Sequence, residues 1–586
     1  MNAGPCSRTT VGRPDSDYVH RYIRRGLGGV LAGFLSGLVL AFTVGSLSFG
    51  LIFGAVLGAF YSVGTRPAEG GYAASVMTSA TFGVPLWGLV SVVALPLLAH
   101  RMPDWSAGGM REHFPALVGW VLFCASLGVM NQAVTNLARS VWGPEAKPQV
   151  PSSARFPPKR IVILGGGFAG MTTAQCLEEE LETELSVQIA LISENNALLF
   201  TPMLAEVAAS SLEPGDISTP LRSTLRRTEF VRARITGIDL NKRHVCLEGS
   251  GRAEPASQSR EVAYDLLVLA LGSVSNYLGL PNVEKRAFNF KSLLDAIRIR
   301  NHVIDMFERA DREPDPLVRA PLLTFVIAGG GFAGVELAGA LNDFAHGILA
   351  DYPNLDPHEV QVVLVHAQNR ILPELSESLA GYAEEKMAAR GVQFRLGTRL
   401  ADARPGVVVL SNGEIPAETL VWTAGTAPNP IVKLLDVEKD KRGAVKVDAN
   451  LAVPGHVGVW ALGDCAAVTD AKSGKPCPPT AQFALREAKI VAANLAAHLR
   501  GDSCKAFHFD SLGALCVIGY QTACAELTLP FARARALQFS GLLAWLMWRG
   551  IYLAKLPGLE RKIRVLFAWT VELFFPRDIV QTIDLK

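Results

Sequence analysis

The hexapeptide GGGFAG occurs twice in the chain, at residues 165–170 and 329–334. Each copy has the spacing G-x-G-x-x-G, in which the first glycine allows a tight turn, the second lets a pyrophosphate approach the backbone and the third lets a helix pack on a strand. Each copy also follows an apolar run that predicts a strand, at residues 160–164 and 324–328, and begins a predicted helix whose free N–H groups favour an anion. The sequence therefore predicts two dinucleotide-binding units. The expected contacts are Gly165, Gly167, Phe168, Ala169 and Gly170 in the first unit and Gly329, Gly331 and Gly334 in the second.

The second strand of each unit is expected to end beside the adenosine ribose of the nucleotide. In the first unit this strand ends at Glu194, 29 residues after the glycine turn begins, and a carboxylate there accepts hydrogen bonds from both ribose hydroxyls. In the second unit the strand ends at His366, 37 residues after the turn begins, with Gln368 and Arg370 close behind. These side chains would not repel a 2′-phosphate, so NADH and NADPH both stay open as ligands of the second unit.

From Pro157 to Lys586 the sequence resembles the two-dinucleotide flavoprotein reductases, and among them the type II, non-proton-pumping NADH:quinone dehydrogenases. The resemblance rests on RIVILGGGFAGMTTAQCL and YDLLVLALGSVSNYLGLPNVEKRAFNFKSLLDA in the first unit, and on FVIAGGGFAGVELAGAL and LVWTAGTAPNP in the second. It continues with VGVWALGDCAA, PPTAQFALREAK and the C-terminal tail, in the order that the family has them. The resemblance implies an α/β fold with two Rossmann-type domains, the NAD domain being inserted in the FAD domain.

The resemblance also implies which cofactor each unit holds. The first unit holds FAD, with Glu194 on its ribose. Gly272 of ALGS matches the turn that closes on the flavin, although Leu271 stands where Thr is usual. Asp464 of ALGDCA matches the acid that binds the ribityl and pyrophosphate region of the flavin. The second unit then holds NAD(P)H, with Gly425 of WTAGTAP at the same site, and we expect no metal.

Glu336, five residues after Gly331, has two interpretations. A carboxylate in the first turns of a helix is a capping charge that complements the helix dipole. In the family that the sequence resembles, the equivalent glutamate lies beside the nicotinamide and assists the movement of a hydride or a proton. Both interpretations stay open, and we treat Glu336 as a candidate catalytic residue.

Residues 478–489 depart from the quinone-side pattern AQxAxQ of the family, because they contain AQFALR. Gln482 is retained, and the resemblance places it beside the flavin ring and the quinone pocket as a second candidate catalytic residue, next to Phe483. Arg486 replaces the second glutamine and lies on the same helix face as Gln482. This cation favours a quinone carbonyl or an anionic reduced quinone, or it is a surface charge paired with the neighbours of Glu487.

The amino-terminal part of the chain predicts a transmembrane block of about four spans, which accounts for the mean hydropathy of +0.25. Residues 26–64 form a run of 39 residues without a charge. As one helix this run would be roughly 58 Å long, nearly twice the roughly 30 Å of a bilayer core, so two spans with a tight turn at residues 45–48 fit better. Further spans are expected at residues 72–99 and 114–137. Close packing of the first two spans is predicted by glycines at every fourth position, which are Gly29, Gly33, Gly37, Gly50, Gly54 and Gly58.

The charges that flank the spans predict their orientation. Arg21, Arg24 and Arg25 precede the first span and place the amino terminus in the cytoplasm, and four spans return the chain to that side. We therefore expect the catalytic domain on the cytoplasmic side of the inner (plasma) membrane, although Arg101 and Arg111 count mildly against this topology. A secretory or twin-arginine signal is the competing interpretation, and it is disfavoured because the apolar run is too long and further spans follow. The spans contain no Asp, Glu, Lys, Arg or His, which favours an anchor over a transporter.

The C-terminal tail predicts helices that lie in the membrane interface. Residues 533–564 contain seven Lys or Arg and one acid, interleaved with Trp545, Trp548 and Tyr552. Such segments place aromatic rings at the headgroup level and cations toward anionic lipid. The apolar run at residues 537–548 has only 12 residues, too few to span a bilayer. The same surface also suits a homodimer, and either use brings the catalytic domain to the bilayer, where a membrane quinone enters.

Composition narrows the other possible functions. A net charge of +2 without a Lys/Arg-rich block argues against a nucleic-acid partner. The nine cysteines form no CxxC pair, which disfavours a zinc site and the dithiol disulfide reductases. Sulfide:quinone reductases share the fold but use two redox cysteines near the flavin, and Cys246 and Cys465 lack the expected surroundings. A membrane sensor with a vestigial reductase fold is the last alternative, and the retention of both glycine turns and Asp464 argues against it.

These observations divide the chain into six predicted segments. The predicted segments are a transmembrane block at residues 1–142, a proline- and serine-rich linker at 143–158, the first part of the FAD domain at 159–320, the NAD(P)H domain at 321–435, the second part of the FAD domain at 436–530 and the membrane-interface helices at 531–586.

Overall fold

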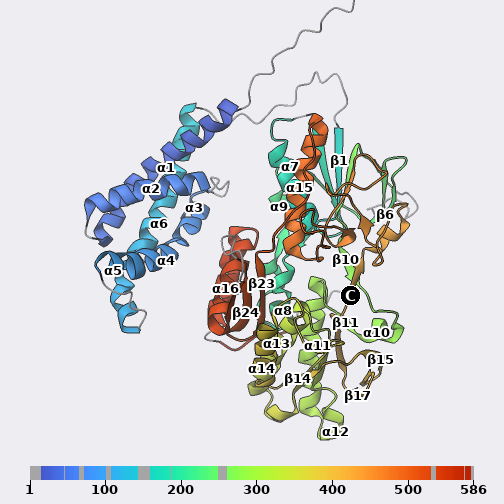
Figure 1. Cartoon of the computed structure of the whole chain (residues 1–586). Helices are drawn as coiled ribbons and strands as arrows, with labels where there is room; N and C mark the ends of the chain where they lie inside the picture. Colours follow the sequence, from blue (N-terminus) through green and yellow to red (C-terminus); the bar gives the residue numbers. More distant parts are fainter. Residues whose placement is uncertain are drawn as a thin grey trace, which may run out of the picture. The chain divides into compact units, whose positions relative to one another are not determined.

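The structure is a computed structural model of the 586-residue chain. It describes residues 15–44, 46–64, 71–100, 107–142, 159–184, 186–248, 260–528, 536–572 and 575–581. The predicted linker at residues 143–158 lies outside the described residues, as do Arg101 and Arg533. The chain divides into two compact units, Met1–Gln149 and Val150–Lys586, and each is described by itself (Figure 1).

Four helical runs make up the described part of the N-terminal unit, and the third of them is interrupted. The elements are α1 (Asp15–Val44), α2 (Leu47–Gly64), α3 (Gly71–Ala80), α4 (Gly83–Leu86), the π-helical stretch η1 (Trp87–Ala94), α5 (Leu95–Leu98) and α6 (Ala107–Trp142). The break between α1 and α2 falls within the predicted turn at residues 45–48. The third predicted span is not one regular helix, and Pro96, which has no N–H to donate, stands two residues after the end of its π-helical part.

Length and composition support one of the predicted spans directly. Among the described residues, the segment Pro115–Ala138 of α6 is long and apolar enough to cross a membrane. Two shorter apolar helical segments, Gly26–Phe42 and Leu47–Ser62, belong to α1 and α2. The count of four spans therefore stays a prediction.

The glycines of α1 and α2 bring the two backbones into contact. A Cβ added to Gly33 would lie 2.0 Å from the carbonyl oxygen of Gly54, and one added to Gly58 would lie 2.1 Å from that of Gly29. Real Cβ atoms do not approach so closely, so these positions tolerate only glycine at this helix separation. The close approach predicted from the glycine spacing is confirmed.

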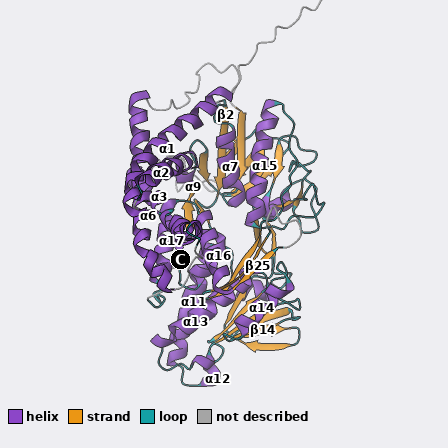
Figure 2. Ribbon diagram, turned by 60° about the vertical axis from the view of Figure 1, so that its left-hand side comes forward, coloured by secondary structure: helices purple, strands orange, loops and turns teal. Residues whose placement is uncertain are grey.

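The first sheet of the second unit is parallel and has the strand order β21-β9-β1-β2-β5. Its strands are β1 (Lys159–Leu164), β2 (Val187–Ser193), β5 (Glu229–Arg232), β9 (Leu266–Leu269) and β21 (Val459–Ala461). The helices α7 (Phe168–Glu180) and α15 (Ala481–Arg500) pack against each other beside this sheet (Figure 2). The central strands are apolar on both sides, as expected for a parallel sheet that is covered on both faces.

The second sheet is also parallel and has the order β11-β18-β12-β13-β14. Its strands are β11 (Phe288–Asn289), β12 (Thr324–Ala328), β13 (Gln361–Val365), β14 (Val392–Arg395) and β18 (Thr419–Trp422), and its helices are α11 (Leu293–Arg312), α13 (Phe332–Gly347) and α14 (Glu377–Ala388). Because β11 and α11 belong here, this part of the fold begins before residue 321, where the sequence placed the domain boundary.

One narrow ribbon connects the two Rossmann sheets. β10 (Ser273–Ser275) follows the first sheet, and β19 (Thr426–Pro428) follows the second. The two strands pair in antiparallel register, with Val274 opposite Ala427. The chain therefore leaves the first sheet and returns to it along two adjacent strands, which confirms the insertion of one Rossmann domain in the other.

The C-terminal part begins with an antiparallel sheet of β23 (Gly513–Gly519), β24 (Thr522–Leu527) and β25 (Leu537–Ser540), followed by α16 (Gly541–Lys555) and α17 (Leu559–Val571). The start of the predicted apolar helix, at residue 537, is therefore a strand. Trp545 and Trp548 are 7% and 2% exposed, so the prediction that these rings lie at the headgroup level is wrong. They are buried because α16 packs against β24 and α17.

The remaining described elements surround these sheets. They are β3 (Ala197–Leu199), α8 (Leu204–Ala208), β4 (Ser218–Pro220), α9 (Leu221–Thr224), β6 (Ile235–Asp239), β7 (His244–Leu247), β8 (Arg260–Ala263), α10 (Pro281–Arg286), α12 (Pro316–Arg319), β15 (Leu400–Arg404), β16 (Val407–Leu410), β17 (Gly413–Pro416), β20 (Val445–Lys446) and β22 (Ala466–Ala467).

Candidate functional site

The first glycine turn links β1 to α7 and leaves the helix N-terminus open. Gly165 has a φ of +109°, which favours glycine, and a Cβ there would lie 2.1 Å from the carbonyl oxygen of Ala270. A Cβ on Gly170 would lie 1.9 Å from the carbonyl oxygen of Gly165. In contrast, no described atom lies within 4 Å of a Cβ added to Gly167, the N-cap of α7. Gly165 and Gly170 thus close the turn, and Gly167 leaves room for a pyrophosphate on the free N–H groups.

The two residues inside this turn pack into the core. The ring of Phe168 lies 5.8 Å from that of Phe200, measured between centroids. Ala169 is 8% exposed and lies beside Gly463, where an added Cβ would be 3.2 Å from the Cβ of Ala169. Both residues belong to the first turn of α7, where backbone N–H groups have no partner within the helix.

The second glycine turn repeats this geometry between β12 and α13. Gly329 has a φ of +125°, and a Cβ on Gly334 would lie 1.9 Å from its carbonyl oxygen. Gly331 caps α13, and the nearest described atom to a Cβ added there is a carboxylate oxygen of Glu374, 3.8 Å away. The two turns are therefore equivalent cradles, each on its own sheet.

The register of the sheets shows which residues are equivalent at the strand ends. The last residue of β1 pairs with Ile192, and the last residue of β12 pairs with Val365. Counting on from these pairs, Glu194 in the first unit corresponds to Ala367 in the second. The sequence alone makes His366 the equivalent of Glu194, but His366 stands one residue before the equivalent position, Ala367.

The contacts of His366 explain why it does not take the place of the missing carboxylate. Its Nδ1 accepts a hydrogen bond from the Gly330 N–H at 3.0 Å, so the ring supports the glycine turn as a neutral imidazole. Burial lowers the pKa of His366 and favours this neutral form. Arg370 donates to the carbonyl oxygens of Pro373 and Leu375, at 3.0 and 3.2 Å. The strand end of the second unit therefore presents the exposed Ala367. In the first unit the corresponding residue, Glu194, is an exposed carboxylate 3.9 Å from Arg234.

Asp464 lies in a short 3-10 turn, Gly463–Cys465, against the first glycine turn. Its Oδ2 accepts a hydrogen bond from the Ser273 hydroxyl at 2.5 Å and lies 3.9 Å from the Lys291 ammonium. Asp295 holds the backbone of this lysine, because its carboxylate accepts the Lys291 N–H at 3.0 Å. Burial lowers the pKa of Lys291, and Asp464 opposes that shift. This arrangement offers a hydroxyl, a carboxylate and an ammonium beside the first cradle.

Glu487 is a second buried acid at the same turn, and it is 2% exposed. Its Oε2 accepts the Gly463 N–H at 2.7 Å. Burial raises the pKa of Glu487 to about 7, and the nearby charge of Asp464 adds to this shift. Glu487 therefore fixes the turn that carries Asp464.

Gly272 and Gly425 stand at the ends of the ribbon that connects the two sheets. Gly272 has a φ of +67°, and its carbonyl accepts the Asn429 N–H at 3.1 Å. The carbonyl of Gly425 accepts the Asn276 N–H at 3.0 Å. Each glycine thus lies where one Rossmann unit meets the other.

Glu336 occupies the second turn of α13, and its carboxyl contacts β23, which disfavours the capping interpretation. The first turn of α13 contains no acid, and the Glu336 Oε1 accepts the Val517 N–H of β23 at 3.4 Å. Burial, with a smaller contribution from the neighbouring charge of Glu206, raises the pKa of Glu336 to about 8. A carboxyl that is neutral near pH 7 does not act as a capping charge, but it can donate a proton.

Gln482 is the second residue of α15 and faces the loop before β23. Its Nε2 donates to the Ser511 hydroxyl at 3.3 Å, and with the amide turned over it would bridge Leu512 and Gly513 at 3.2 Å each. The ring of Phe483 lies 5.3 Å from that of Phe509, measured between centroids.

Arg486 lies over the Phe509 ring, with its guanidinium carbon 5.1 Å from the ring centroid. Burial lowers the pKa of Lys555, and the positive charge of Arg486 lowers it as well. Glu487 faces the opposite way, toward Gly463. The structure therefore groups Gln482, Phe483 and Arg486 around one loop.

Sequence reasoning missed three acidic or basic residues of this region: Lys291, Glu487 and Glu206. Glu487 lies in the buried stripe of α15, between Ala484 and Val491, and an acid at an apolar helix position is a recognisable signal. Glu206 likewise interrupts an apolar run on α8, where four of the five residues are buried. Lys291 carried no such signal, because its partner Asp464 is distant in sequence.

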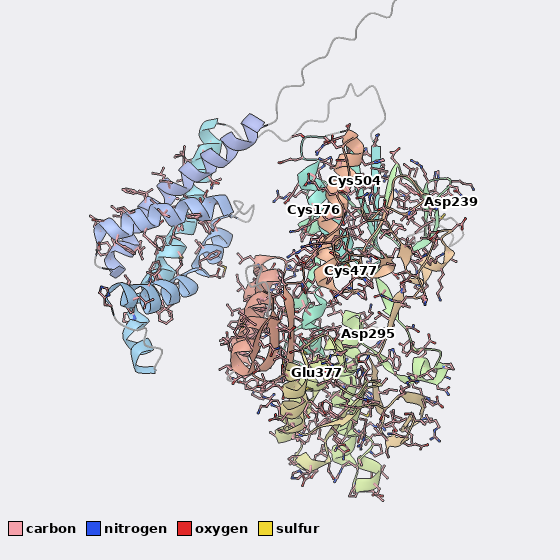
Figure 3. The ribbon with its side chains drawn as sticks, in the orientation of Figure 1. Cys176, Asp239, Asp295, Glu377, Cys477 and Cys504 are labelled. Carbon is pink, nitrogen blue, oxygen red and sulfur yellow. The ribbon has the colours of Figure 1, made fainter. Side chains whose placement is uncertain are left out.

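Among the described residues the cysteines form no disulfide. The eight described cysteines are free thiols. Burial raises the pKa of Cys465 to about 12, and its sulfur contacts the carbonyl oxygens of Leu269 and Leu462 at 3.4 and 3.3 Å. Figure 3 shows Cys176 and Cys477 in the half of the unit that is built on the first sheet. A thiolate is the reactive form, so these surroundings disfavour sulfide chemistry at Cys465.

Two family models match the second unit. The model described as pyridine nucleotide-disulphide oxidoreductase matches residues 159–488. The model described as NDH2 C-terminal domain matches residues 512–578, which include the antiparallel sheet β23-β24-β25 with α16 and α17.

The chain is similar to several curated proteins and solved structures. It is 32% identical over 441 residues to the type II NADH:quinone oxidoreductase Ndh of Mycobacterium tuberculosis, covering 72% of this chain and 90% of that protein. It is 33% identical over 429 residues to a probable NADH dehydrogenase of Dictyostelium discoideum, covering 72% and 91%. A solved structure of NDH2 from Plasmodium falciparum in complex with NADH has the same fold, with a TM-score of 0.65 and 18% identity over 72% of this chain and 100% of that chain.

Proposed function

The chain belongs to the pyridine nucleotide-disulphide oxidoreductases and, within them, to the type II NADH:quinone oxidoreductases, and from this membership we propose which parts of the molecule carry the reaction. It oxidises NADH and reduces a quinone as a flavoprotein, without pumping protons. The observation that carries the proposal is the pair of equivalent nucleotide cradles on two sheets that one ribbon connects.

We assign FAD to the first cradle, at the N-terminus of α7. The open space at Gly167 fits a pyrophosphate, because only a glycine leaves it free. Glu194 is exposed at the strand end, where it would hold the ribose, and Asp464 with Lys291 would face the flavin side of the nucleotide. The flavin, when bound, accepts a hydride from the nicotinamide and passes two electrons to the quinone. The FAD domain then comprises residues 159–286 and 436–511.

We assign NAD(P)H to the second cradle, in a domain of residues 288–435. Ala367 leaves the ribose position without a carboxylate, so a 2′-phosphate meets no like charge there. His366 plays no direct part in this tolerance, because its ring supports the glycine turn. NADH and NADPH should therefore both serve as donors.

We place the quinone near Gln482, Phe483 and Arg486. Gln482 offers an amide beside the loop before β23, and Phe483 and Phe509 offer apolar walls. Arg486 supplies a cation near Lys555 that favours the carbonyl oxygens of a quinone as they gain electrons.

We propose that both units meet a bilayer. In the second unit α16 and α17 expose Leu542, Leu543, Leu546 and Phe567, which are between 53% and 69% exposed. In the N-terminal unit the exposed apolar residues of α1, α2 and α6 include Leu31, Ile52, Phe60 and Leu122. Apolar side chains on the outside of a helical bundle suit lipid as the surrounding medium. The positive-inside rule then places the catalytic domain on the cytoplasmic side of the inner membrane.

We also propose that the chain forms a homodimer through its C-terminal region. The exposed leucines of α16 are the surface that supports this proposal, and they serve lipid or a second copy equally well. Chemical cross-linking of the full chain in detergent, followed by gel electrophoresis, distinguishes a dimer from a monomer.

The test of the proposed function is a steady-state assay of the purified full chain in vesicles that contain a quinone. We expect oxidation of NADH and of NADPH that depends on the quinone and leaves the vesicle interior at constant pH. Oxidation of NADH that does not require the quinone would contradict the proposal that a quinone is the electron acceptor. Strict rejection of NADPH would contradict the role given to Ala367. Activity in inside-out but not in right-side-out membrane vesicles tests the proposed side of the membrane.

A further inference from the structure

One wall of the proposed quinone site belongs to a short segment, residues 507–511, which precedes β23. The ring of Phe509 in this segment lies 5.3 Å from that of Phe483 and 5.1 Å from the guanidinium carbon of Arg486. No ion pair or side-chain hydrogen bond joins Arg486 to another described residue, so the Phe509 ring is the contact that holds its guanidinium. The position of this cation therefore depends on the position of one aromatic ring.

The carboxylate of Asp470 connects this segment to the loop that precedes α15. The Asp470 side chain is 8% exposed. Its Oδ1 accepts the N–H groups of Lys472 and Ser473 at 3.1 and 2.6 Å, within its own loop. Its Oδ2 accepts the Phe509 N–H at 3.0 Å and the Nδ1–H of His508 at 2.6 Å. One carboxylate thus joins two loops, with one oxygen for each.

Asp470 is ionised although it is buried. Burial raises the pKa of Asp470, but the hydrogen bonds that its carboxylate accepts, led by those from the Ser473 and Phe509 N–H groups, outweigh burial and hold the pKa below its usual range. Hydrogen bonds to an ionised group are stronger than those between neutral groups. The carboxylate is therefore a firm anchor for the Phe509 backbone.

The two ends of the segment are held without this carboxylate. Phe507 is fully buried in the core of the first Rossmann unit. The hydroxyl of Ser511 accepts a hydrogen bond from Gln482 at 3.3 Å. The middle of the segment, which carries the Phe509 ring, is the part that Asp470 fixes.

A second link between the two loops is weak. The ammonium of Lys472 lies 4.0 Å from the carboxylate of Asp510, and these side chains are 71% and 79% exposed. Ion pairs that are exposed to this degree contribute little. His508 also meets Asp510, at 3.2 Å, but that contact lies within the segment itself. Asp470 is therefore the main link.

We propose that Asp470 is a positioning residue for quinone reduction: it sets where the Phe509 ring lies, and therefore where the Arg486 guanidinium meets the quinone. This inference rests on the proposed function, which places the quinone beside these side chains. The described side-chain contacts of Asp470 all lie in the two loops. The oxidation of NADH at the second cradle should therefore not depend on Asp470.

The test compares the wild type with Asp470→Asn, Phe509→Leu, the double variant and a control, Asp440→Asn, in the flavin-loaded full chain. Asparagine keeps one acceptor oxygen for its own loop but turns an NH₂ group toward the Phe509 N–H, so that bond is lost. Asp440 is the matched control, because its Oδ1 accepts the N–H groups of Arg442 and Ala444 at 2.9 and 2.8 Å within its own loop.

Steady-state kinetics with a decyl-substituted benzoquinone separate this role from a general loss of structure. In Asp470→Asn the KM for the quinone should rise about tenfold, the lower end of what a hydrogen bond to a charged group contributes. Both kcat and kcat/KM for NADH should stay within about twofold of the wild type. Phe509→Leu should show the same rise, and the double variant should equal it, because Asp470 acts through that ring. The control should match the wild type.

Amide hydrogen exchange, followed by mass spectrometry without quinone, tests the link itself. The Phe509 N–H should exchange faster in Asp470→Asn than in the wild type, and at the wild-type rate in Asp440→Asn. Asp470→Glu keeps the charge but displaces the carboxylate by one methylene group, so it should have the same effects on exchange and on the KM for the quinone. This variant carries the test if Asp470→Asn does not fold.

Three results would overturn the proposal. The first is a wild-type KM for the quinone in both Asp470→Asn and Asp470→Glu. The second is an equal loss of kcat/KM for NADH and for the quinone, which would indicate general damage to the fold. The third is a double variant with a clearly higher KM than Phe509→Leu, which would show that Asp470 acts by another route. A wild-type enzyme that reduces no quinone would instead contradict the proposed function itself.

Discussion

Substituting Gly334 by alanine should weaken the use of NADH and leave the flavin in place. A Cβ at this position would lie 1.9 Å from the carbonyl oxygen of Gly329 and 2.6 Å from the hydroxyl of Thr423. Both atoms are fixed, because Gly329 starts the turn and the Thr423 hydroxyl donates to the carbonyl of Ala328 at 2.9 Å. The helix or the turn therefore has to move.

The size of the movement follows from the contact distance. Real Cβ atoms stay at least 3.0 Å from other heavy atoms, so the turn and the helix separate by about 1 Å or more. A misplacement of about 1 Å can cost about 10²-fold in rate. We expect kcat/KM for NADH to fall by about this factor, equivalent to about 2.7 kcal/mol.

The assay measures three quantities on Gly334→Ala: the flavin content, kcat/KM for NADH, and the rate at which quinone reoxidises the chemically reduced enzyme. Only kcat/KM should change. Gly347→Ala is the matched control, because it lies on the same helix and no described atom is within 4 Å of the added Cβ. Loss of flavin in Gly334→Ala, or an unchanged kcat/KM, would refute the assignment of the second cradle to the nicotinamide nucleotide.

Three further predictions concern other parts of the chain. Ala367→Glu restores a carboxylate at the ribose, so kcat/KM for NADPH should fall at least about tenfold while that for NADH is kept, as measured by steady-state kinetics. Glu487→Gln should reduce the loss of thermal stability between about pH 4.5 and 7, because burial raises the pKa of Glu487 to about 7, so that in this range the unfolded state releases a proton that the native state keeps. Calorimetry over this range measures the change. Gly33→Leu should destabilise the N-terminal unit by about 3 kcal/mol or more, because its side chain would meet the Gly54 carbonyl at 2.0 Å, and thermal circular dichroism in detergent measures the loss.

Each of these predictions has a result that contradicts it. Equal NADPH use by Ala367→Glu and the wild type would show that the strand end does not meet the ribose. A pH dependence of stability that is unchanged in Glu487→Gln would place the titrating group elsewhere. For the N-terminal unit, Gly88→Ala is the control, since no described atom lies within 4 Å of its added Cβ, and equal melting of both variants would refute the close contact of α1 and α2.

The sequence predicts best those features that local backbone geometry decides. Both glycine turns and the strands before them agree with the structure. The packing of α1 on α2 could also be predicted from the sequence, because glycines at every fourth position lie on one face of a helix. These features need only neighbours within one or two turns of the chain.

Features that depend on contacts between residues far apart in the sequence could not be predicted from the sequence. The strand end of the second unit needed the register of β12 with β13 to show that Ala367, and not His366, corresponds to Glu194. Trp548 was expected at the lipid headgroups, but α17 and β24 cover the helix that carries it. Glu206 meets Trp569 across 363 residues of sequence, a contact that no local pattern announces.

The central claim is that one chain takes a hydride from a nicotinamide nucleotide and gives two electrons to a quinone. An anaerobic titration of the purified full chain tests it most directly, with the flavin absorbance as the signal. We predict that one equivalent of NADH bleaches the flavin and that one equivalent of a quinone then restores its absorbance. A flavin that NADH does not bleach, or that a quinone does not restore, would contradict the account.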